Sequence, residues 1–311
     1  MASKFYNLLE SMIDQINRSA KSINGFTPNA AGEVTIKEPV NLLDNSDFRD
    51  PVNQQGLTEY TNTGGNVQTI DRWKINSENG NVVFTVVKNT GVTCMVDNSG
   101  VSFCQVVSAS EIIKSKVYTF AVMAQALGEY HIICASGRLS DGSISFNSDY
   151  GRIMLTYDSS TDSYIANISG TAAYVWAALY EGEYTEDTLP EYKPKDRLAE
   201  LAECYRYYRV FNFTNYIGAG LSTSEIYFNV DLGGIPMRSQ PTVTMSTLPT
   251  TVYVEGATGS WVIDESTVAL QNYTDGDTVL GVYSKSTKTA TYVNKRATRV
   301  DQIGFIFDAR P

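Results

Sequence analysis

The sequence contains little of what metal and redox sites are built from. Its 311 residues include one histidine, His131, which cannot supply a multi-histidine metal site. His131 lies in the strand-like run Glu129–Cys134, and since nothing nearby suggests a base or ligand partner, we interpret it as structural. No two cysteines have C-x-x-C spacing, so we expect reduced thiols, although Cys94 and Cys104 could face each other across neighbouring strands. The four cysteines are Cys94, Cys104, Cys134 and Cys204.

Basic residues and long apolar runs are also scarce. Lys and Arg number 24 against 34 Asp and Glu, and the net charge of −10 repels phosphate backbones, so we expect no nucleic-acid partner. No apolar run approaches the ~18 residues of a membrane helix, and the N-terminus has no apolar signal region. We therefore expect no membrane insertion and no secretory signal. G-x-S-x-G and phosphate-loop motifs are missing, so we also expect no cofactor.

Acidic residues occur in close pairs, but their pattern does not favour catalysis. A glycosidase needs two carboxylates about 5–10 Å apart in a shielded cleft, whereas these pairs lie in turn-like segments. Asp275-Gly276-Asp277 favours a hairpin turn over calcium binding, because the further ligands of an EF-hand are missing. The sequence predicts a protein that is not an enzyme, with no catalytic residues and no metal site. The pairs are Glu181 with Glu183, Glu186 with Asp187, Asp264 with Glu265, and Asp275 with Asp277.

Tyrosine, by contrast, is abundant. The chain has 20 Tyr beside many Thr, Ser and Asn, a bias typical of β-strands and of binding surfaces. Apolar residues make up 42%, enough for a sizeable core, and the length suits about two domains. The composition therefore predicts a folded, mainly β protein.

Residues 1–24 predict an N-terminal helix that needs a partner. Apolar residues recur in residues 4–23 with the spacing of a coiled-coil seam, and Asn24-Gly25 ends the helix because both tolerate a left-handed C-cap. A helix of this length is marginally stable alone. It packs either on its own domain or, as we expect, on copies of itself in a homotrimer. The oligomerisation residues are Phe5, Leu9, Met12, Ile16 and Ile23.

The rest of the chain divides into two β regions joined by a helix. Residues 25–40 form a linker in which Pro28 and Pro39 stop any helix. Short strands separated by Gly, Ser, Asn and Asp clusters predict a β-sandwich over residues 41–190. Residues 191–209 predict a connecting helix, and residues 210–311 are again β. The predicted fold is thus a coiled-coil helix, a jelly-roll β-sandwich, a short helix and a C-terminal β-sandwich tip.

Two blocks of sequence resemble phage or prophage tail-fibre proteins. Asn41–Phe48 followed by Asp71-Arg72-Trp73 resembles the opening of a tail-fibre jelly roll, which is similar to carbohydrate-binding modules. Lys116–Phe120 and Trp176–Gly182 resemble the central and last strands of that module. The second block is Leu201–Arg209, then Gly234–Thr244, and the final strand Ile303–Ala309.

This resemblance implies a receptor-binding protein of a virion tail or tail-like particle. It would be assembled in the bacterial cytoplasm and act outside the cell, attached through its N-terminus to a baseplate or tail protein. Its partner would be a bacterial surface glycan, bound without catalysis. Two alternatives stay open: a polysaccharide depolymerase tailspike, and a purely structural fibre segment.

Sugar recognition needs exposed aromatic rings with amides or carboxylates beside them. Trp73, Trp176 and Phe120 are expected in the core, and Tyr205-Arg206-Tyr207-Tyr208 is expected to be a structural joint between helix and strand. The region to test first is therefore 246–300. The predicted ligand-binding residues are Trp261, Tyr253, Tyr273, Tyr283, Tyr292, Asn272, Asp275 and Asn294.

Overall fold

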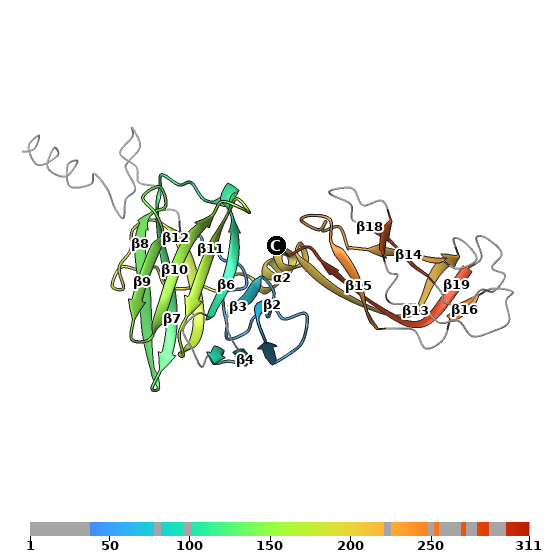
Figure 1. Ribbon diagram of the computed structural model, residues 1–311, viewed down its shortest axis with the longest axis horizontal. Coiled ribbons are helices and arrows are strands. Elements are labelled where there is room, and N and C mark those ends of the chain that lie inside the picture. Colours follow the sequence, from blue (N-terminus) through green and yellow to red (C-terminus); the bar gives the residue numbers. More distant parts are fainter. Residues whose placement is uncertain are drawn as a thin grey trace, which may run out of the picture. The chain divides into compact units, whose positions relative to one another are not determined.

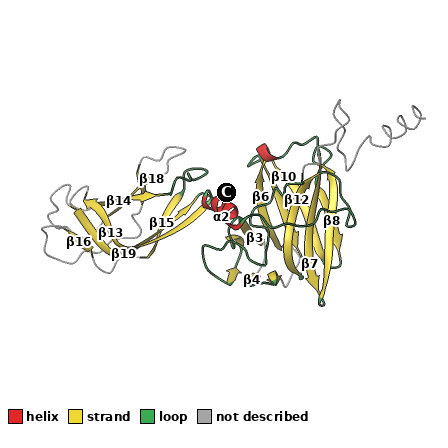
Figure 2. Cartoon of the chain, turned by 180° about the vertical axis from the view of Figure 1, so that it is seen from behind, coloured by secondary structure: helices red, strands yellow, loops and turns green. Residues whose placement is uncertain are grey.

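The protein is mainly β, and strands dominate in Figure 2. The computed structural model describes residues 38–77, 82–95, 101–220, 225–247, 252–254, 269–271, 279–285 and 297–310. The predicted helix of residues 4–23, with its oligomerisation seam, and most of the 25–40 linker lie outside these residues. Within the described ranges no helix is long and apolar enough to cross a membrane.

The chain forms two compact units, and each is built from separate pieces of sequence. The first comprises residues 1–49, 61–65 and 75–193, and the second comprises residues 50–60, 66–74 and 194–311. The second unit thus takes in two segments from within the predicted 41–190 domain.

Two six-stranded sheets make up the sandwich (Figure 1). The first has the order β1 (Glu59–Asn62), β4 (Val82–Val87), β5 (Gly91–Met95), β12 (Ala173–Glu181), β7 (Val117–Ala126) and β8 (Glu129–Arg138). The second has the order β2 (Gly65–Gln68), β3 (Trp73–Ser77), β6 (Val101–Ser108), β11 (Ser163–Ser169), β10 (Gly151–Asp158) and β9 (Ile144–Ser148). A short 3-10 helix, η1 (Ala109–Glu111), follows β6.

Aromatic side chains fill the space between the two sheets. Phe84 of β4 and Phe103 of β6 have ring centroids 4.7 Å apart, and Phe103 also meets Phe48 at 5.3 Å. Tyr174 of β12 reaches across to Gly151 and Gly170, where an added Cβ would come within 2.7 Å of its hydroxyl. This packing confirms the predicted β-sandwich and is compatible with a jelly-roll-like module. Trp73 and Phe120 are fully buried, as predicted.

The outer face of the first sheet carries a second, smaller core. After β12 the chain turns back over β7 and β12, and Tyr184 packs with Ala121, Ala178 and Tyr180. Trp176 stacks on Tyr192 with centroids 4.8 Å apart and planes 3° from parallel. Trp176 is therefore buried as predicted, but under this returning segment rather than between the sheets. The covering explains why β7 and β12 are apolar on both faces.

The second unit contains the α-helix of the described chain, α2 (Arg197–Tyr205), and one sheet. Asp196 caps α2 by accepting N–H bonds from Leu198 and Ala199, both 3.0 Å. The helix is shorter than the predicted 191–209, because Pro194 precedes the cap and strand geometry resumes at Tyr208. The sheet order is β15 (Thr242–Thr247), β19 (Ala297–Asp308), β13 (Tyr208–Gly220), β14 (Glu225–Asp231), β18 (Val279–Lys285) and β17 (Ala269–Gln271), while β16 (Val252–Val254) also pairs with β19.

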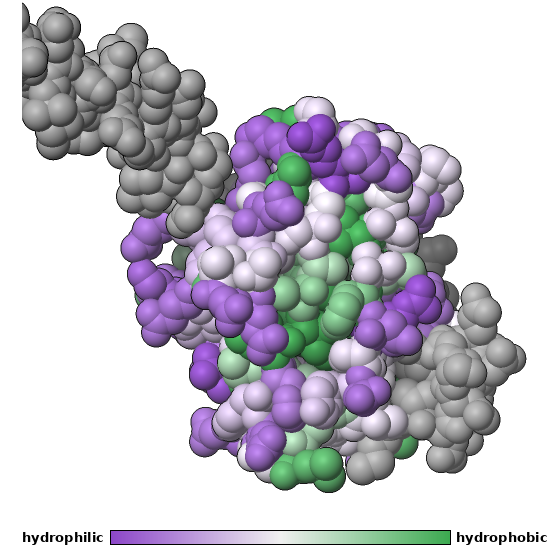
Figure 3. All heavy atoms as spheres, turned by 90° about the vertical axis from the view of Figure 1, so that its left-hand side faces the viewer, coloured by the Kyte–Doolittle hydropathy of each residue, from purple (hydrophilic) through white to green (hydrophobic). Residues whose placement is uncertain are grey.

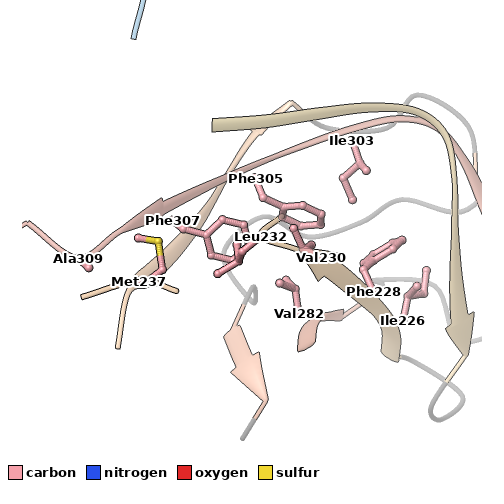
Figure 4. Close-up of a cluster of buried hydrophobic side chains, with 10 residues drawn as sticks. All are labelled: Ile226, Phe228, Val230, Leu232, Met237, Val282, Ile303, Phe305, Phe307 and Ala309. Carbon is pink, nitrogen blue, oxygen red and sulfur yellow. The ribbon is translucent and has the colours of Figure 1, made fainter. Parts of the chain in front are cut away.

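The strands of this sheet enclose a separate hydrophobic core within the second unit. Among the described residues, β13 and β14 pair at Ala219↔Tyr227 and Gly220↔Ile226, and toward the start of β13 the two strands diverge and leave room for side chains. Phe305 of β19 points toward Phe228 of β14, with centroids 5.7 Å apart (Figure 4). The described strands therefore form one sheet where the sequence predicted a second sandwich. The buried cluster is Ile226, Phe228, Val230, Leu232, Met237, Val282, Ile303, Phe305, Phe307 and Ala309.

Candidate functional site

The ligand-binding residues predicted from the sequence fall mostly outside the described chain. Two of them lie on strands whose backbone is described: Tyr253 is opposite Arg299 in the β16–β19 pair, and Tyr283 is opposite Tyr227 in the β14–β18 pair. β19, β13 and β14 separate these two strands, so the sheet does not make them neighbours. Those outside the described residues are Trp261, Tyr273, Tyr292, Asn272, Asp275 and Asn294.

The tyrosines and arginines that follow α2 form a closed cluster. Tyr207 and Tyr208 are 6% and 4% exposed, and Arg209 is buried. Arg209 donates to the carbonyl oxygen of Tyr205 at 2.8 Å and to those of Leu232 and Ile235. Its burial lowers its pKa from the ordinary value. No ligand atom could reach these donors without displacing backbone partners.

Further cations pack on the same rings. The Arg72 guanidinium lies 3.5 Å from the Tyr207 centroid, and the Arg310 guanidinium lies 4.0 Å from the Tyr208 centroid. Arg310 also binds Asp308 through two hydrogen bonds of 2.9 and 2.6 Å. We call Tyr205, Tyr207, Tyr208, Arg209 and Arg310 the Tyr–Arg cluster. Its contacts stabilise the second unit.

A buried carboxylate lies beside this cluster. Asp71 is 1% exposed and accepts a hydrogen bond of 3.0 Å from the Gln54 amide, which also donates to the carbonyl oxygen of Tyr208 at 2.6 Å. Burial raises the pKa of Asp71 to about 7, although the Gln54 hydrogen bond and the positive charges of Arg310 and Arg197 oppose the rise. The proton on this group therefore comes off near neutral pH.

Exposed aromatic rings gather instead at one edge of the sandwich. β8 ends one sheet and β9 ends the other, so in the described chain both strands are edge strands. We call Tyr130, His131, Phe146 and Tyr150 the aromatic edge. Figure 3 shows the side of the first unit where β8 and β9 lie, with apolar side chains gathered in its middle and polar ones around them.

Two tight turns place these rings. Leu127 and Gly128, both with positive φ (54° and 85°), turn β7 into β8 and bring Tyr130 and His131 to the start of the strand. Asp149 and Tyr150 form the turn between β9 and β10, where the Ser148 hydroxyl accepts the Tyr150 N–H at 3.3 Å. The aromatic edge is therefore fixed by hairpins rather than by long loops.

Phe146 and Tyr130 are exposed, whereas His131 and Tyr150 are half-buried. His131 and Tyr150 stack with centroids 3.6 Å apart and planes 7° from parallel. Phe146 is opposite the buried Ile153, so it points to the core side of the sheet, yet at this margin it is 47% exposed. Tyr130 is 62% exposed. Such rings can stack on the apolar face of a ligand without any rearrangement of the core.

The polar groups around the edge suit hydrogen bonding better than catalysis. Glu129 and Asp149 are exposed carboxylates next to Tyr130 and Tyr150. Edge strands also present backbone N–H and C=O groups that no neighbouring strand takes up. Within the described residues no group of three or more His, Cys, Asp or Glu is arranged to hold a metal ion. Of the acidic pairs, Glu181, Glu183, Glu186 and Asp187 are exposed, and Glu181 binds Lys116 at 2.6 Å.

Sequence reasoning missed this edge. It assigned His131 a structural role and did not recognise β9 as a strand. A signal was present, because Ile144-Ser145-Phe146-Asn147 alternates apolar and polar residues before the turn-forming Asp149-Tyr150-Gly151. That signal predicts a short strand, but no sequence pattern shows that this strand ends a sheet next to β8.

Comparisons of the chain with protein-family models, with curated proteins and with solved structures found no match.

Proposed function

We propose that the protein is a non-catalytic receptor-binding protein of the phage tail-fibre class, which adheres to a bacterial surface glycan through the aromatic edge. The observation that carries the site assignment is the 47% exposure of Phe146, four residues before Tyr150 of the stacked His131–Tyr150 pair. The tail-fibre class rests on the resemblance of Asn41–Phe48, Asp71–Trp73 and Leu201–Arg209.

A glycan is the ligand that this combination fits. Pyranose rings have apolar faces that stack on aromatic side chains, and their hydroxyls need donors and acceptors at the margin. The edge supplies rings from Phe146 and Tyr150, and it supplies backbone polar groups from β8 and β9. An apolar protein partner would use the rings but would leave edge backbone groups unpaired, which costs free energy.

The oligomer and the particle are parts of the same proposal. Residues 1–24 would form the homotrimer and attach it to a baseplate or tail protein, placing the chain in a virion tail. Three copies would raise a weak affinity per site by about 10²–10⁴ when all engage one surface. Light scattering on the full chain tests this: a monomer at micromolar concentration contradicts the trimer.

The site is tested with the full chain on an array of bacterial surface glycans. We expect Tyr150→Ala and Phe146→Ala each to weaken glycan binding about tenfold, the effect of losing about 1.4 kcal/mol of stacking and apolar contact. The matched control is Tyr157→Ala, which removes a ring that is 41% exposed at the far end of β10. Equal losses in the control and edge variants would contradict the assignment.

The residues predicted in the C-terminal region form the competing site within this function. Trp261→Ala and Tyr273→Ala in the same array decide between the two surfaces. Loss of binding in these variants, with the edge variants unchanged, would move the receptor site to residues 246–300.

A further inference from the structure

We propose that the aromatic edge binds the interior of an extended, uncharged oligosaccharide chain rather than a single terminal sugar or an acidic polysaccharide. The inference rests on the proposed function and goes beyond it by naming the class of glycan and how the glycan lies.

The rings form a row rather than a pocket. Phe146 lies in β9 and Tyr150 in the turn that follows, four residues further along the chain. The stretch Phe146–Ser148 is extended and spans about 7 Å at about 3.3 Å per residue, and Asp149 then turns the chain toward β10. Because the two rings stand on different parts of the hairpin, a chain of sugars can stack on both, one sugar to each ring.

The row is also open, as a passing chain requires. Phe146 is 47% exposed, and Tyr150 is half-buried and stacks with one face on His131. A terminal sugar is usually held in a concave site that encloses it. When the interior of an oligosaccharide is bound, the chain must leave the site at both ends, and an open strand edge allows this.

The charges at the edge select against acidic sugars. Asp149 precedes Tyr150 directly, and Glu129 lies two residues before His131. Both carboxylates are exposed, and the whole chain carries a net charge of −10. Arg152 lies opposite Asn147 and, unlike Phe146, on the outer side of the sheet, and Arg49, which lies near Tyr130, is already paired with Asp47 at 2.7 Å. A uronic or sialic acid at the row would face repulsion, whereas a neutral sugar would not.

Strand addition by a peptide or a second copy is the main rival, because β9 is an edge strand of five residues. The exposed rings favour the glycan, since strand addition uses backbone groups and does not require Phe146 or Tyr150 to stack. Self-association that Asn147→Pro abolishes, without any glycan dependence, would support the rival and overturn the proposal.

The experiment compares neutral oligosaccharides of one to six residues, and oligomers containing uronic acid, as soluble competitors for the best array glycan. With the full chain we expect affinity to rise about tenfold or more from one residue to four, and the acidic oligomers to bind at least about tenfold more weakly. Affinity for neutral chains should stay constant from about 50 mM to about 500 mM salt, because no charge pair is involved.

Phe146→Ala supplies a readout that a structural role would not give. It should remove the dependence on chain length and leave monosaccharide affinity within about twofold, because Tyr150 still offers one stacking surface. Tyr157→Ala should keep the full length dependence. A single cooperative unfolding transition in each variant confirms that it folds.

The results separate the two proposals. Edge-dependent binding that is equal for one and four sugars, or that prefers acidic oligomers, overturns the extended neutral chain and leaves the receptor-binding function standing. Glycan binding that no edge variant changes overturns the chain inference and moves the function to another surface. An array on which no glycan binds contradicts both.

Discussion

The Tyr–Arg cluster and the aromatic edge are both rich in aromatic residues, but they do opposite things. In the cluster, Tyr207 and Tyr208 are nearly inaccessible, and Arg209 gives its hydrogen bonds to carbonyl oxygens. At the edge, Phe146 and Tyr130 are about half exposed or more. The two regions differ in whether the aromatic rings are already covered by other side chains of the protein. A ring covered by a guanidinium stabilises its own unit, whereas a ring with a free face can stabilise a complex.

The comparison also shows how far composition alone indicates function. Tyr205–Arg209 is the densest run of aromatic and cationic residues in the chain, and its composition is typical of a binding hot spot. The structure places it where the end of α2, the start of β13 and the loop that carries Leu232 and Ile235 meet. Residue type alone therefore does not distinguish a structural junction between helix and strand from a binding site.

The largest loss of stability is expected when the Tyr–Arg cluster is disrupted. Arg209→Leu removes hydrogen bonds to three carbonyl oxygens and leaves those acceptors buried, so we expect the second unit to lose about 4 kcal/mol of stability. Hydrogen exchange of the amides in α2 and β13 measures the loss. Arg206→Leu is the control, since Arg206 makes one half-exposed ion pair with Glu203 at 3.2 Å and should cost less than about 1 kcal/mol. Equal costs for the two variants would mean that the cluster is not a closed structural unit.

The next effect is a dependence on pH. Asp71 has a folded pKa of about 7, above the ordinary 3.8, so the folded state holds a proton that the unfolded state has released. Stability is therefore full below about pH 4 and falls as the pH rises through 7, by about 3 kcal/mol between pH 5 and pH 8. Urea unfolding of the second unit over this range measures the fall. Asp71→Asn keeps an acceptor for Gln54 and should remove the dependence; a variant with the unchanged pH profile would assign the effect to another group.

A smaller effect should separate stability from binding at the edge. Tyr150→Ala should lower glycan affinity about tenfold while costing about 1 kcal/mol or less of stability, because Tyr150 contacts one ring, His131, at the surface. Array binding and thermal unfolding are measured on the same preparation. A large loss of stability with unchanged binding would show that the aromatic edge has a structural role, like the Tyr–Arg cluster, and not a binding role.

The smallest effect is expected at Tyr130. This side chain is 62% exposed and points away from the core side, opposite Gln125, so Tyr130→Ala should change stability by less than about 0.5 kcal/mol. Glycan affinity should fall about threefold, because Tyr130 lies beside the row rather than in it. An unchanged affinity would narrow the site to His131, Phe146 and Tyr150.

Much of the fold follows from local sequence patterns. The apolar runs within Asn81–Lys88 and Lys116–Gln125 are strand signals, and they coincide with β4 and β7 almost to the residue. β13, the longest strand within the described residues, is harder to predict from its sequence. Its residues Phe211, Phe213 and Tyr216 stand on one side because Asn215, with φ of 53°, reverses the alternation between Phe213 and Tyr216. A left-handed residue inside a strand breaks the period-2 pattern on which strand prediction depends.

The candidate site was harder to predict than the strands. Whether Phe146 is covered depends on whether another strand pairs with the open edge of β9, and no local sequence pattern predicts that. Trp176 shows the same limit: the sequence predicted its burial, but not that Tyr192 covers it from outside the sandwich. Sequence patterns predict that a residue prefers burial or a strand, while topology decides which preferred surfaces stay open.

The discontinuous second unit has a consequence for how the chain is made and how it can be recombined. Residues 50–60 and 66–74 leave the ribosome long before residues 194–311. Most of the sandwich is therefore synthesised before these two segments can contact the rest of the second unit. Contacts between segments so far apart in sequence form slowly, which makes completion of this unit a late event. A C-terminal region exchanged at residue 194 between two such proteins would arrive without the segments that hold Asp71 and Gln54 against Tyr208. Successful exchange would require those early segments to change together with the C-terminal region.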